Sequence, residues 1–527
     1  MYEIKEYAGL IRNHKVLSEE LDVDTAGLDR ESREKAIMEA AYSKWGHDLG
    51  NHINGQFAAI FEDTETGDIF ATRDVLGAEL LFFYETDTAL ICSTAITDIL
   101  DHPLYTPQVN EELVPIFLQF TYVPGEHTLF KDIEKVEPGG WLSYTDGHLE
   151  LGKYWTLSFD PQEDKDLDQW ADEIEETMKA AVQDVCDDDD EYTSFLSGGV
   201  DSSYIMAMSN SKAGLCCAYD DSASEEVEAA ETAKALGRDF HAIRISQDDV
   251  LGCLDEFIRA YEQPSADIAG LALYAACKKM TGMTDMCFSG EGADEFFGGY
   301  SVYAPKNATR MSLPGNTYMG TTHIMNHAEL KRYLKAEPAE HADRDLMTSR
   351  AAGSEGYDPV SRLLYTDLRG YFEGSILFNS TKIARGTGLD IRMPYCDLRM
   401  FDIACRMPSR FKATQDGNKL ALRKAAERVL PMDAAYRKKM GFPVPISNWM
   451  KTPEMYSEIA RAFESSSAEI FFDTDELGAL LDSFLGKKPR VSHPIWFARH
   501  KALLWRHIWT IYVFIRWHEI FFGAAGK

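Results

Sequence analysis

Short apolar runs separated by turn residues occupy positions 54–93. The runs read GQFAAIFED, IFATRD, LLFFYE and ALICS, with TETGD between the first two. Apolar runs of this length with such breaks are typical of β-strands. A hairpin is also expected at residues 140–155, where Asp146-Gly147 separates two alternating segments. We therefore predict an antiparallel, β-rich domain over residues 1–158.

The pattern changes after a polar, proline-containing stretch at residues 158–168, which we interpret as a linker. A helical pattern follows, and short apolar segments then alternate with amphipathic ones. Strand, helix, strand at this spacing favours a parallel sheet, so we predict an α/β domain over residues 169–527. The expected strands are residues 215–220, 240–245 and 286–289, and the expected helices are residues 170–185, 225–236, 249–261 and 270–280.

Charge and cysteine usage narrow the class of protein. The formal net charge is -33, so the average surface repels phosphate backbones and anionic lipid, and nucleic-acid binding is not expected. The nine cysteines form no CxxC pair. They are interpreted as reduced thiols, which indicates a cytoplasmic protein.

No membrane segment is expected. The N-terminus lacks the features of a signal peptide. The most apolar stretch, residues 505–522, is interrupted by Arg506, Arg516 and Glu519, leaving too few consecutive apolar residues to cross a bilayer. We predict a buried C-terminal helix there, although its aromatic residues could also serve a contact in a homodimer or with a partner protein.

The first candidate site is SGGVDSS at residues 197–203. A buried strand is expected to end at Leu196 and a helix to begin near Ser202, which directs backbone N–H groups and the positive end of a helix at one place. The two glycines allow close approach of a phosphate, and Asp201 could hold Mg²⁺ against it. A glycine turn that only joins strand to helix is the alternative.

The motif is not a Walker A sequence, since GxxxxGKS is absent and the turn has no lysine. SGGVDSS resembles the pyrophosphate loop of the N-type ATP pyrophosphatases, which cut ATP between the α and β phosphates and form adenylates. By itself this resemblance leaves several reactions open, including tRNA thiolation and argininosuccinate synthesis.

Further motifs narrow the choice. GEGADEFFGGY at residues 290–300, LDIRMPYCD at 389–397 and KLALRKAAERVLPMDAAYRKKMGFPVP at 419–445 follow in order. Together with SGGVDSS they resemble asparagine synthetases. The strands of residues 54–93 and the segment VPGEHTLFKDIEKVEPGG resemble the later part of that family's glutaminase domain. The resemblance extends from about residue 42 to the C-terminus.

This resemblance implies an AMP-forming amide synthetase that uses ATP and Mg²⁺. Asp201 and Asp294 are expected to hold the magnesium ion. Lys439 is the expected cation near the α-phosphate, with its neighbour Lys438 as a substitute. Glu291 corresponds to a glutamate thought to assist deprotonation of the attacking ammonia, whereas lactam-forming relatives have a tyrosine there. The residues implied to bind the nucleotide are Leu196, Ser197, Gly198, Gly199, Asp201, Ser202, Ser203 and Gly290.

The chain also departs from the family pattern. Tyr2 stands where the glutaminase nucleophile, a cysteine after the initiator methionine, is usual, and the glutamine-binding segments are missing. We therefore predict a degenerate glutaminase-like domain without glutamine hydrolysis. Asp390 replaces a family glutamate and Thr381 a family aspartate, which puts the aspartate-binding character of the pocket in question. A loop that contains Glu262-Gln263-Pro264 and Asp267 is another candidate for lining this pocket.

Three hypotheses follow. The first is a ligase that adenylates a small-molecule or peptide carboxylate and transfers it to ammonia or an amine, with an intramolecular lactam or peptide-cyclising reaction as a variant. The second is a noncatalytic, regulatory relative. The third is the use of glutamine nitrogen supplied by a partner glutaminase. The sequence does not identify the carboxylate.

Overall fold

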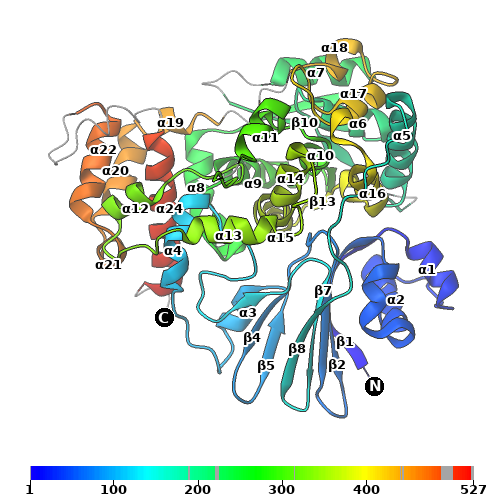
Figure 1. Ribbon diagram of the computed structural model, residues 1–527, viewed down its shortest axis with the longest axis horizontal. Coiled ribbons are helices and arrows are strands. Elements are labelled where there is room, and N and C mark those ends of the chain that lie inside the picture. Colours follow the sequence, from blue (N-terminus) through cyan, green and yellow to red (C-terminus); the bar gives the residue numbers. More distant parts are fainter. Residues whose placement is uncertain are drawn as a thin grey trace.

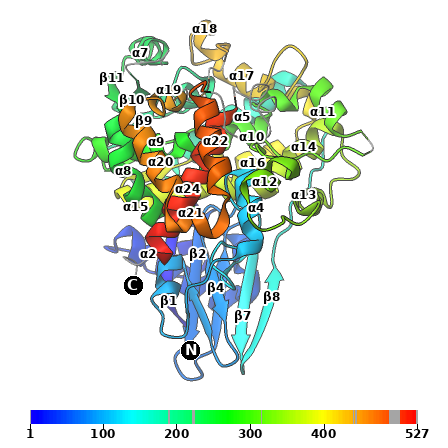
Figure 2. The ribbon, with the colours of Figure 1, turned by 90° about the vertical axis from the view of Figure 1, so that its left-hand side faces the viewer.

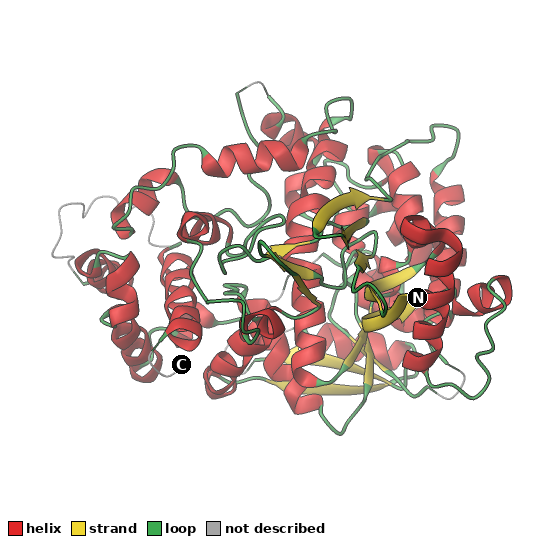
Figure 3. Ribbon diagram, turned by 90° about the horizontal axis from the view of Figure 1, so that it is seen from below, coloured by secondary structure: helices red, strands yellow, loops and turns green. Residues whose placement is uncertain are grey.

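The computed structural model describes residues 2–187, 190–219, 225–313, 315–438, 441, 444–487 and 503–523. An N-terminal antiparallel domain lies below a larger domain built on a parallel sheet (Figure 1). Seen from below, helices flank the strands, and the C-terminal helices are set to one side (Figure 3). The predicted fold class is confirmed.

The N-terminal domain contains two antiparallel sheets. The five-stranded sheet has the order β1-β2-β3-β7-β8, and the three-stranded sheet has the order β5-β4-β6. The predicted hairpin is present, and Asp146 and Gly147 at its turn both have positive φ, at 51° and 79°. The strands are β1 (Tyr2–Ile11), β2 (Gly55–Asp63), β3 (Ile69–Arg73), β4 (Phe82–Glu85), β5 (Leu90–Ser93), β6 (Glu134–Lys135), β7 (Gly140–Thr145) and β8 (His148–Lys153).

Two helices connect β1 to β2, in the part of the domain where the glutamine-binding segments were missing from the sequence. They are α1 (His14–Glu20) and α2 (Arg30–Trp45). Helix α2 begins after Asp29, whose carboxylate accepts a hydrogen bond from the Ser32 backbone N–H. Its buried residues Ile37 and Met38 pack in one core with Phe57 of β2. The helices thus cover a face of the larger sheet.

The larger domain is built on one sheet whose strands are all parallel, in the order β11-β10-β9-β12-β13. They are β9 (Thr193–Phe195), β10 (Ala213–Ala218), β11 (Asp239–Arg244), β12 (Met286–Phe288) and β13 (Asp390–Arg392). The helices between the first four strands are α6 (Val200–Met208), α7 (Glu226–Ala235), α8 (Gln247–Tyr261) and α9 (Ile268–Met280), and α5 (Leu167–Gln183) precedes β9.

Helices dominate the rest of the chain. The longest C-terminal one, α24 (Leu504–Phe522), contacts α20 (Pro453–Phe463) and α22 (Thr474–Phe484) beside it (Figure 2). Its Trp509 and Trp517 are buried, so it belongs to the core of this chain, as predicted. The other helical segments of more than four residues are α3 (Ile96–Leu100), α4 (Val114–Phe120), α10 (Ala293–Phe297), α11 (Pro305–Met311), α12 (His327–Tyr333), α13 (Ala342–Ala351), α14 (Pro359–Asp367), η4 (Leu368–Leu377), α15 (Phe378–Thr387), α16 (Leu398–Arg406), α17 (Leu420–Ala426) and α21 (Ser466–Phe471), together with the 3₁₀ segment η1 (Gly46–His52).

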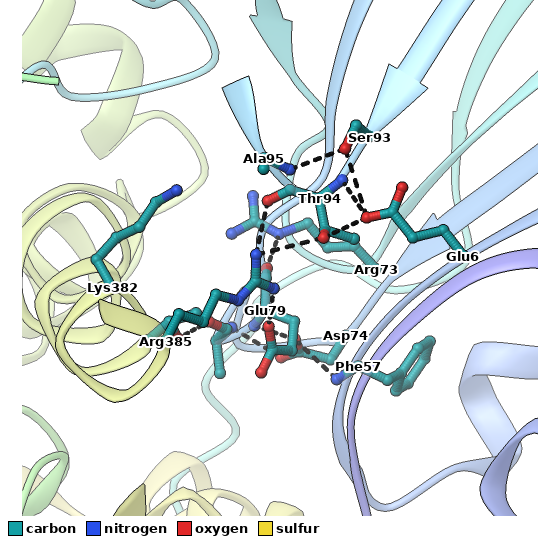
Figure 4. Close-up of polar contacts among 12 residues, drawn as sticks. Glu6, Phe57, Arg73, Asp74, Glu79, Ser93, Thr94, Ala95, Lys382 and Arg385 are labelled. Carbon is teal, nitrogen blue, oxygen red and sulfur yellow. Dashed lines mark hydrogen bonds and ion pairs between the residues drawn. The ribbon is translucent and has the colours of Figure 1, made fainter. Parts of the chain in front are cut away.

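Polar contacts join the two domains along α15 (Figure 4). Arg385 donates hydrogen bonds to the Thr94 carbonyl, at 2.8 Å, and to the Glu79 carboxylate, at 2.6 Å. Thr94 is fixed in turn by Glu6 of β1, which accepts from its backbone N–H at 2.9 Å. One turn earlier on α15, Lys382 forms a buried ion pair with Glu262. Arg385 therefore joins the N-terminal domain to the larger domain through partly buried contacts.

Candidate functional site

The SGGVDSS turn follows β9 and leads directly into α6. The Ser202 hydroxyl accepts a hydrogen bond from the Ser197 backbone N–H, at 3.0 Å, and the Ser197 hydroxyl accepts one from the Gly199 N–H, at 3.1 Å. The Ser203 hydroxyl donates to the Gly199 carbonyl at 2.8 Å. These bonds fold the turn back over the N-terminus of α6, where unpaired N–H groups and the helix dipole favour an anion.

The GEGADE segment follows the neighbouring strand β12, so it meets the SGGVDSS turn at one edge of the sheet. A side chain at Gly290 would place its Cβ 3.4 Å from the Cβ of Asp201 and 3.5 Å from the Ser202 nitrogen. Asp294, in the first turn of α10, is almost completely buried. The two motifs, far apart in sequence, therefore form one site, as expected where parallel strands end together.

Lys419 connects the two aspartates. Its Nζ lies 2.6 Å from Asp201 Oδ2 and 2.6 Å from Asp294 Oδ1, and its side chain is only 2% exposed. Lys419 has a positive φ of 54° and directly precedes α17. A Cβ at Gly299 would lie 1.7 Å from Asp294 Oδ1 and 2.2 Å from Lys419 Cε. Only glycine leaves room for this ion pair.

The two aspartates fit the magnesium site predicted from the sequence. Oδ1 of Asp201 is buried, and it has no hydrogen-bond partner among the residues that the structure describes. Mg²⁺ is commonly held by one or two carboxylates together with phosphate oxygens and water. Within the described ranges no group of three or more His, Cys, Asp or Glu side chains could hold a metal. The residues thus suit a metal that is bound jointly with a phosphate ligand.

A cavity of about 330 Å³ opens over this site. Glu291 also lies in its wall, and the Ser289 hydroxyl donates a hydrogen bond to the Glu291 carboxylate. Beyond the phosphate turn the wall becomes apolar, with Leu215 of β10 and Tyr219 directly after that strand. Of the residues predicted for the nucleotide, the metal and catalysis, the cavity brings together Leu196, Ser197, Gly199, Asp201, Ser202, Gly290, Glu291 and Asp294.

Three of the remaining predicted residues, Gly198, Ser203 and Lys438, do not line the cavity. Ser203 is fully buried and bonded to the turn itself, so its hydroxyl does not line the cavity. Gly198 is also outside the lining, and its carbonyl accepts a hydrogen bond from Arg437 at 3.3 Å. Lys438 does not line the cavity. Lys439 lies outside the described residues, so its assignment stays a prediction.

Away from the phosphate turn, the cavity ends among acidic and amide side chains. Asp267 accepts hydrogen bonds from the Ala269 N–H, at 3.0 Å, and from Asn379 Nδ2, at 2.7 Å. Burial raises the pKa of the Asp267 carboxyl. Nearby, the Tyr300 hydroxyl donates to Glu295, and burial followed by the charge of Glu295 raises the Tyr300 pKa well above 10. Tyr300 is therefore a poor base at neutral pH.

Two positions at which the sequence departs from the family pattern, Thr381 and Asp390, do not line this pocket. The Thr381 hydroxyl donates to the Ala78 carbonyl of the N-terminal domain at 2.6 Å. Asp390 forms ion pairs with Arg30 and Arg392 at 2.8 Å. Changes at Thr381 and Asp390 therefore alter contacts outside the cavity.

The loop that precedes α9 contributes less to the pocket than we predicted. Of its candidate residues only Asp267 lines the cavity. Glu262 accepts hydrogen bonds from the backbone N–H groups of Ile96 and Thr97, each at 3.0 Å. Glu262 thus caps the start of α3 and holds the two domains together.

Sequence reasoning missed the cations that do line the cavity. Lys419, Arg423 and Arg437 all face it, and all three belong to the motif at residues 419–445. Arg423 is held by the Asn418 and Ala435 carbonyls at 2.9 Å and 2.7 Å. In KxxLRxA, Lys419 directly precedes α17 and Arg423 lies in its first turn, where the Arg423 N–H donates to the Lys419 carbonyl at 2.8 Å. That spacing was the signal that could have identified them.

The N-terminal domain offers no exposed thiol at the usual nucleophile position. Tyr2 lies in β1 and packs edge-on against Tyr42, with ring centroids 5.0 Å apart. Cys92 is the only cysteine among the first 158 residues, and burial raises its pKa to about 12. A thiol with such a pKa is not a nucleophile at neutral pH.

Two family models match separate parts of the chain. The sequence model of a family described as asparagine synthase matches residues 173–519. A model described as a glutamine amidotransferase domain matches residues 4–155. Among the described residues, no helix is both long and apolar enough to span a membrane.

Curated relatives cover nearly the whole chain. The glutamine-hydrolyzing asparagine synthetase 1 of Bacillus subtilis is 26% identical over an alignment of 563 positions. The alignment covers 98% of this chain and 85% of the relative. A putative glutamine-hydrolyzing asparagine synthetase of Mycobacterium bovis is 26% identical, over 98% of this chain and 84% of its own. The amidase chry2 of Gibberella zeae is 25% identical over 54% of this chain and 45% of its own.

Proposed function

The chain belongs to the asparagine synthase family, and on that premise we propose that it uses ATP to activate a carboxylate as an acyl-adenylate, which ammonia or an amine then converts to an amide. Family membership makes it a ligase that forms carbon–nitrogen bonds. The observation that carries the finer proposal is the meeting of Asp201, Asp294 and Lys419 beside the SGGVDSS turn, with Glu291 in the same cavity.

The first half-reaction needs the pyrophosphate leaving group to be stabilised. The backbone N–H groups of the turn and the N-terminus of α6 bind its oxygens, and Ser202 orients the turn by accepting from Ser197. Asp201 and Asp294 would hold Mg²⁺, which would neutralise charge on the phosphates. Lys419, which pairs with both carboxylates, would supply a positive charge beside the phosphates. The apolar wall at Leu215 and Tyr219 suits an adenine ring.

The second half-reaction needs a base for the incoming nitrogen. Glu291 fits this role because its carboxylate lines the cavity and is oriented by the Ser289 hydroxyl. Tyr2 cannot replace the missing cysteine nucleophile, so we propose that this chain does not hydrolyse glutamine. The nitrogen donor is then free ammonia or an amine on a small molecule or a peptide, including an amine on the same substrate.

Pyrophosphate release tests the proposal. The protein is incubated with ATP, Mg²⁺ and a panel of carboxylates, each with ammonium or a set of amines, and products are identified by mass spectrometry. We expect at least one pair to give AMP, pyrophosphate and an amide. Asp294→Asn should lose pyrophosphate release by about 10²-fold or more, whereas the exposed Asp248→Asn should not. Formation of ADP and phosphate, or equal turnover in Asp294→Asn, would contradict the adenylation chemistry.

A further inference from the structure

A second cavity, of about 420 Å³, lies between the two domains. Its walls come from the β3–β4 turn and the segment after β8 on one side, and from α13, α14, η4 and α16 on the other. These helices stand above the antiparallel strands (Figure 1). No residue lines both this cavity and the catalytic one. The interdomain cavity is thus a separate space.

One arginine in this cavity is built into the wall. Arg350 is only 9% exposed, and its Nη2 donates to both oxygens of Glu126, at 2.8 Å and 2.6 Å. The guanidinium of Arg350 can approach Gly125 closely because this residue has no side chain. A Cβ there, where φ is +96°, would lie only 2.9 Å from Nη2. Among the described residues, Nε of Arg350 has no hydrogen-bond partner. Its Nη1 forms an ion pair with Glu137, at a long 3.9 Å.

The neighbouring Arg369 has no carboxylate within ion-pair distance in the described part of the chain. Its Nη1 donates instead to the backbone carbonyls of Ser349, Arg350 and Ala352, at 3.4, 3.2 and 3.0 Å. These carbonyls belong to the C-terminal end of α13, which attracts a cation. Arg369 therefore lies next to Arg350, and its charge is not cancelled by an acidic side chain.

Charge and shape together define what the cavity can bind. Each of the other cations is paired: Arg350 with Glu126, Lys153 with Glu137 and Lys135 with Glu373. The four lining cations thus exceed the three lining carboxylates by one, in a chain whose formal net charge is -33. Burial, followed by a hydrogen bond with the adjacent Glu126, raises the pKa of the Glu137 carboxyl. The apolar lining residues are Val75, Leu76, Pro138, Trp155, Leu157, Leu368, Phe372 and Phe401.

We propose that the interdomain cavity is a second ligand site, which binds a small organic carboxylate. The anion lies against the guanidinium groups of Arg369 and Arg350, and its apolar body packs against Trp155 and Phe372. One negative charge balances the unpaired guanidinium. An apolar pocket with a few convergent polar groups is the usual form of a small-molecule site. A phosphate without an apolar body would leave most of this wall unfilled.

Binding of phenylacetate and of its uncharged analogue phenylacetamide, measured by isothermal titration calorimetry with the full chain, tests the proposal. We expect phenylacetate to bind the wild type at least tenfold more tightly than phenylacetamide. Arg369→Gln should remove this preference. Arg310→Gln, an exposed arginine on α11, should preserve it. Thr156→Trp, at the exposed rim of the cavity, keeps all charges and should weaken both ligands by blocking entry.

These variants also separate the two cavities, because neither Arg369 nor Thr156 lines the catalytic one. Circular dichroism and thermal unfolding establish that each variant is folded. No binding of phenylacetate, equal binding of the acid and the amide, or unchanged binding in both Arg369→Gln and Thr156→Trp would overturn the proposal. Loss of binding in these variants with pyrophosphate release intact would support it.

Discussion

Lys419 and Asp294 form an ion pair of 2.6 Å, in which the ammonium group occupies the side of the carboxylate that faces Asp201. The same cation therefore neutralises both predicted metal ligands. A metal ion and Lys419 compete for the same two carboxylates, and a bound phosphate would give the ammonium group an alternative partner. Binding of metal and of nucleotide should consequently depend on each other.

Replacing Lys419 by methionine tests this relationship. Without the ammonium group, two buried carboxylates face each other, so the variant should bind Mn²⁺ in the absence of nucleotide at least tenfold more tightly than the wild type. Pyrophosphate release should fall by about 10²-fold or more, because a cation beside the phosphates is lost. Titration calorimetry measures the first effect. Lys424→Met, on the same helix, is the matched control. Weaker Mn²⁺ binding in Lys419→Met would contradict the competition.

Much of the fold was predictable because its segments carry clear patterns. The strands β10 and β12 are short apolar runs, β11 alternates polar and apolar residues, and the Asp146-Gly147 turn marks its hairpin. Strand β13 was not predicted, since it has three residues and two of them, Asp390 and Arg392, are charged. Its charges are satisfied by partners distant in sequence, which no local pattern reveals. The division of the N-terminal strands between two sheets was likewise not evident.

The site was predictable to the extent that motifs indicate chemistry. Asp201, Glu291 and Asp294 all line the predicted cavity. Lys419 was missed because a lysine ahead of a helix usually faces solvent. Its burial depends on the missing side chain at Gly299 and on two carboxylates from other elements. Such complementarity exists only in the folded chain.

The N-terminal domain should not produce glutamate from glutamine. Hydrolysis of an amide through an acyl-enzyme needs an activated nucleophile, and Tyr2 and the buried Cys92 do not supply one. We expect glutamine to be no better than buffer as a nitrogen source for the purified chain, whereas ammonium or an amine supports product formation. Cys92→Ser should behave as the wild type in both assays. Glutamate released by the wild type would show that the domain retains a different hydrolytic site.

Glu34 should make the stability of the N-terminal domain depend on pH. Its carboxyl accepts hydrogen bonds from the Tyr7 hydroxyl and the Ile11 N–H, at 2.8 Å and 3.0 Å. Burial raises its pKa from 4.5 to about 7. Between these values the folded chain retains a proton that the unfolded chain has released. The contribution of Glu34 to the free energy of unfolding is therefore fully present at low pH. It is lost as the pH rises from 4.5 to about 7, by an amount on the order of 3 kcal/mol.

Glu34→Gln tests this dependence because glutamine keeps an acceptor for Ile11 and a polar partner for Tyr7. The unfolding free energy of the variant, measured with urea, should vary less between pH 5 and pH 7.5 than that of the wild type. Glu31→Gln, on the exposed side of the same helix, should leave the dependence unchanged. Parallel pH profiles for the wild type and Glu34→Gln would mean that Glu34 is ionised in the folded protein throughout this range.

Glu291 should separate the two half-reactions, since a base for the incoming nitrogen is needed only after the adenylate has formed. Glutamine at this position still accepts the hydrogen bond from Ser289 but takes no proton. Glu291→Gln should therefore spare pyrophosphate release while amide formation falls by about 10²-fold or more.

The adenylate should then accumulate or hydrolyse to AMP and the free acid, which rapid quenching and mass spectrometry detect. Ser289→Ala should show the same effect to a smaller degree, because it removes only the group that orients the carboxylate. Equal loss of both half-reactions would assign Glu291 to binding of ATP or of the carboxylate. Survival of both would move the base elsewhere, although Tyr300 is disfavoured as that base by its raised pKa and its hydrogen bond to Glu295.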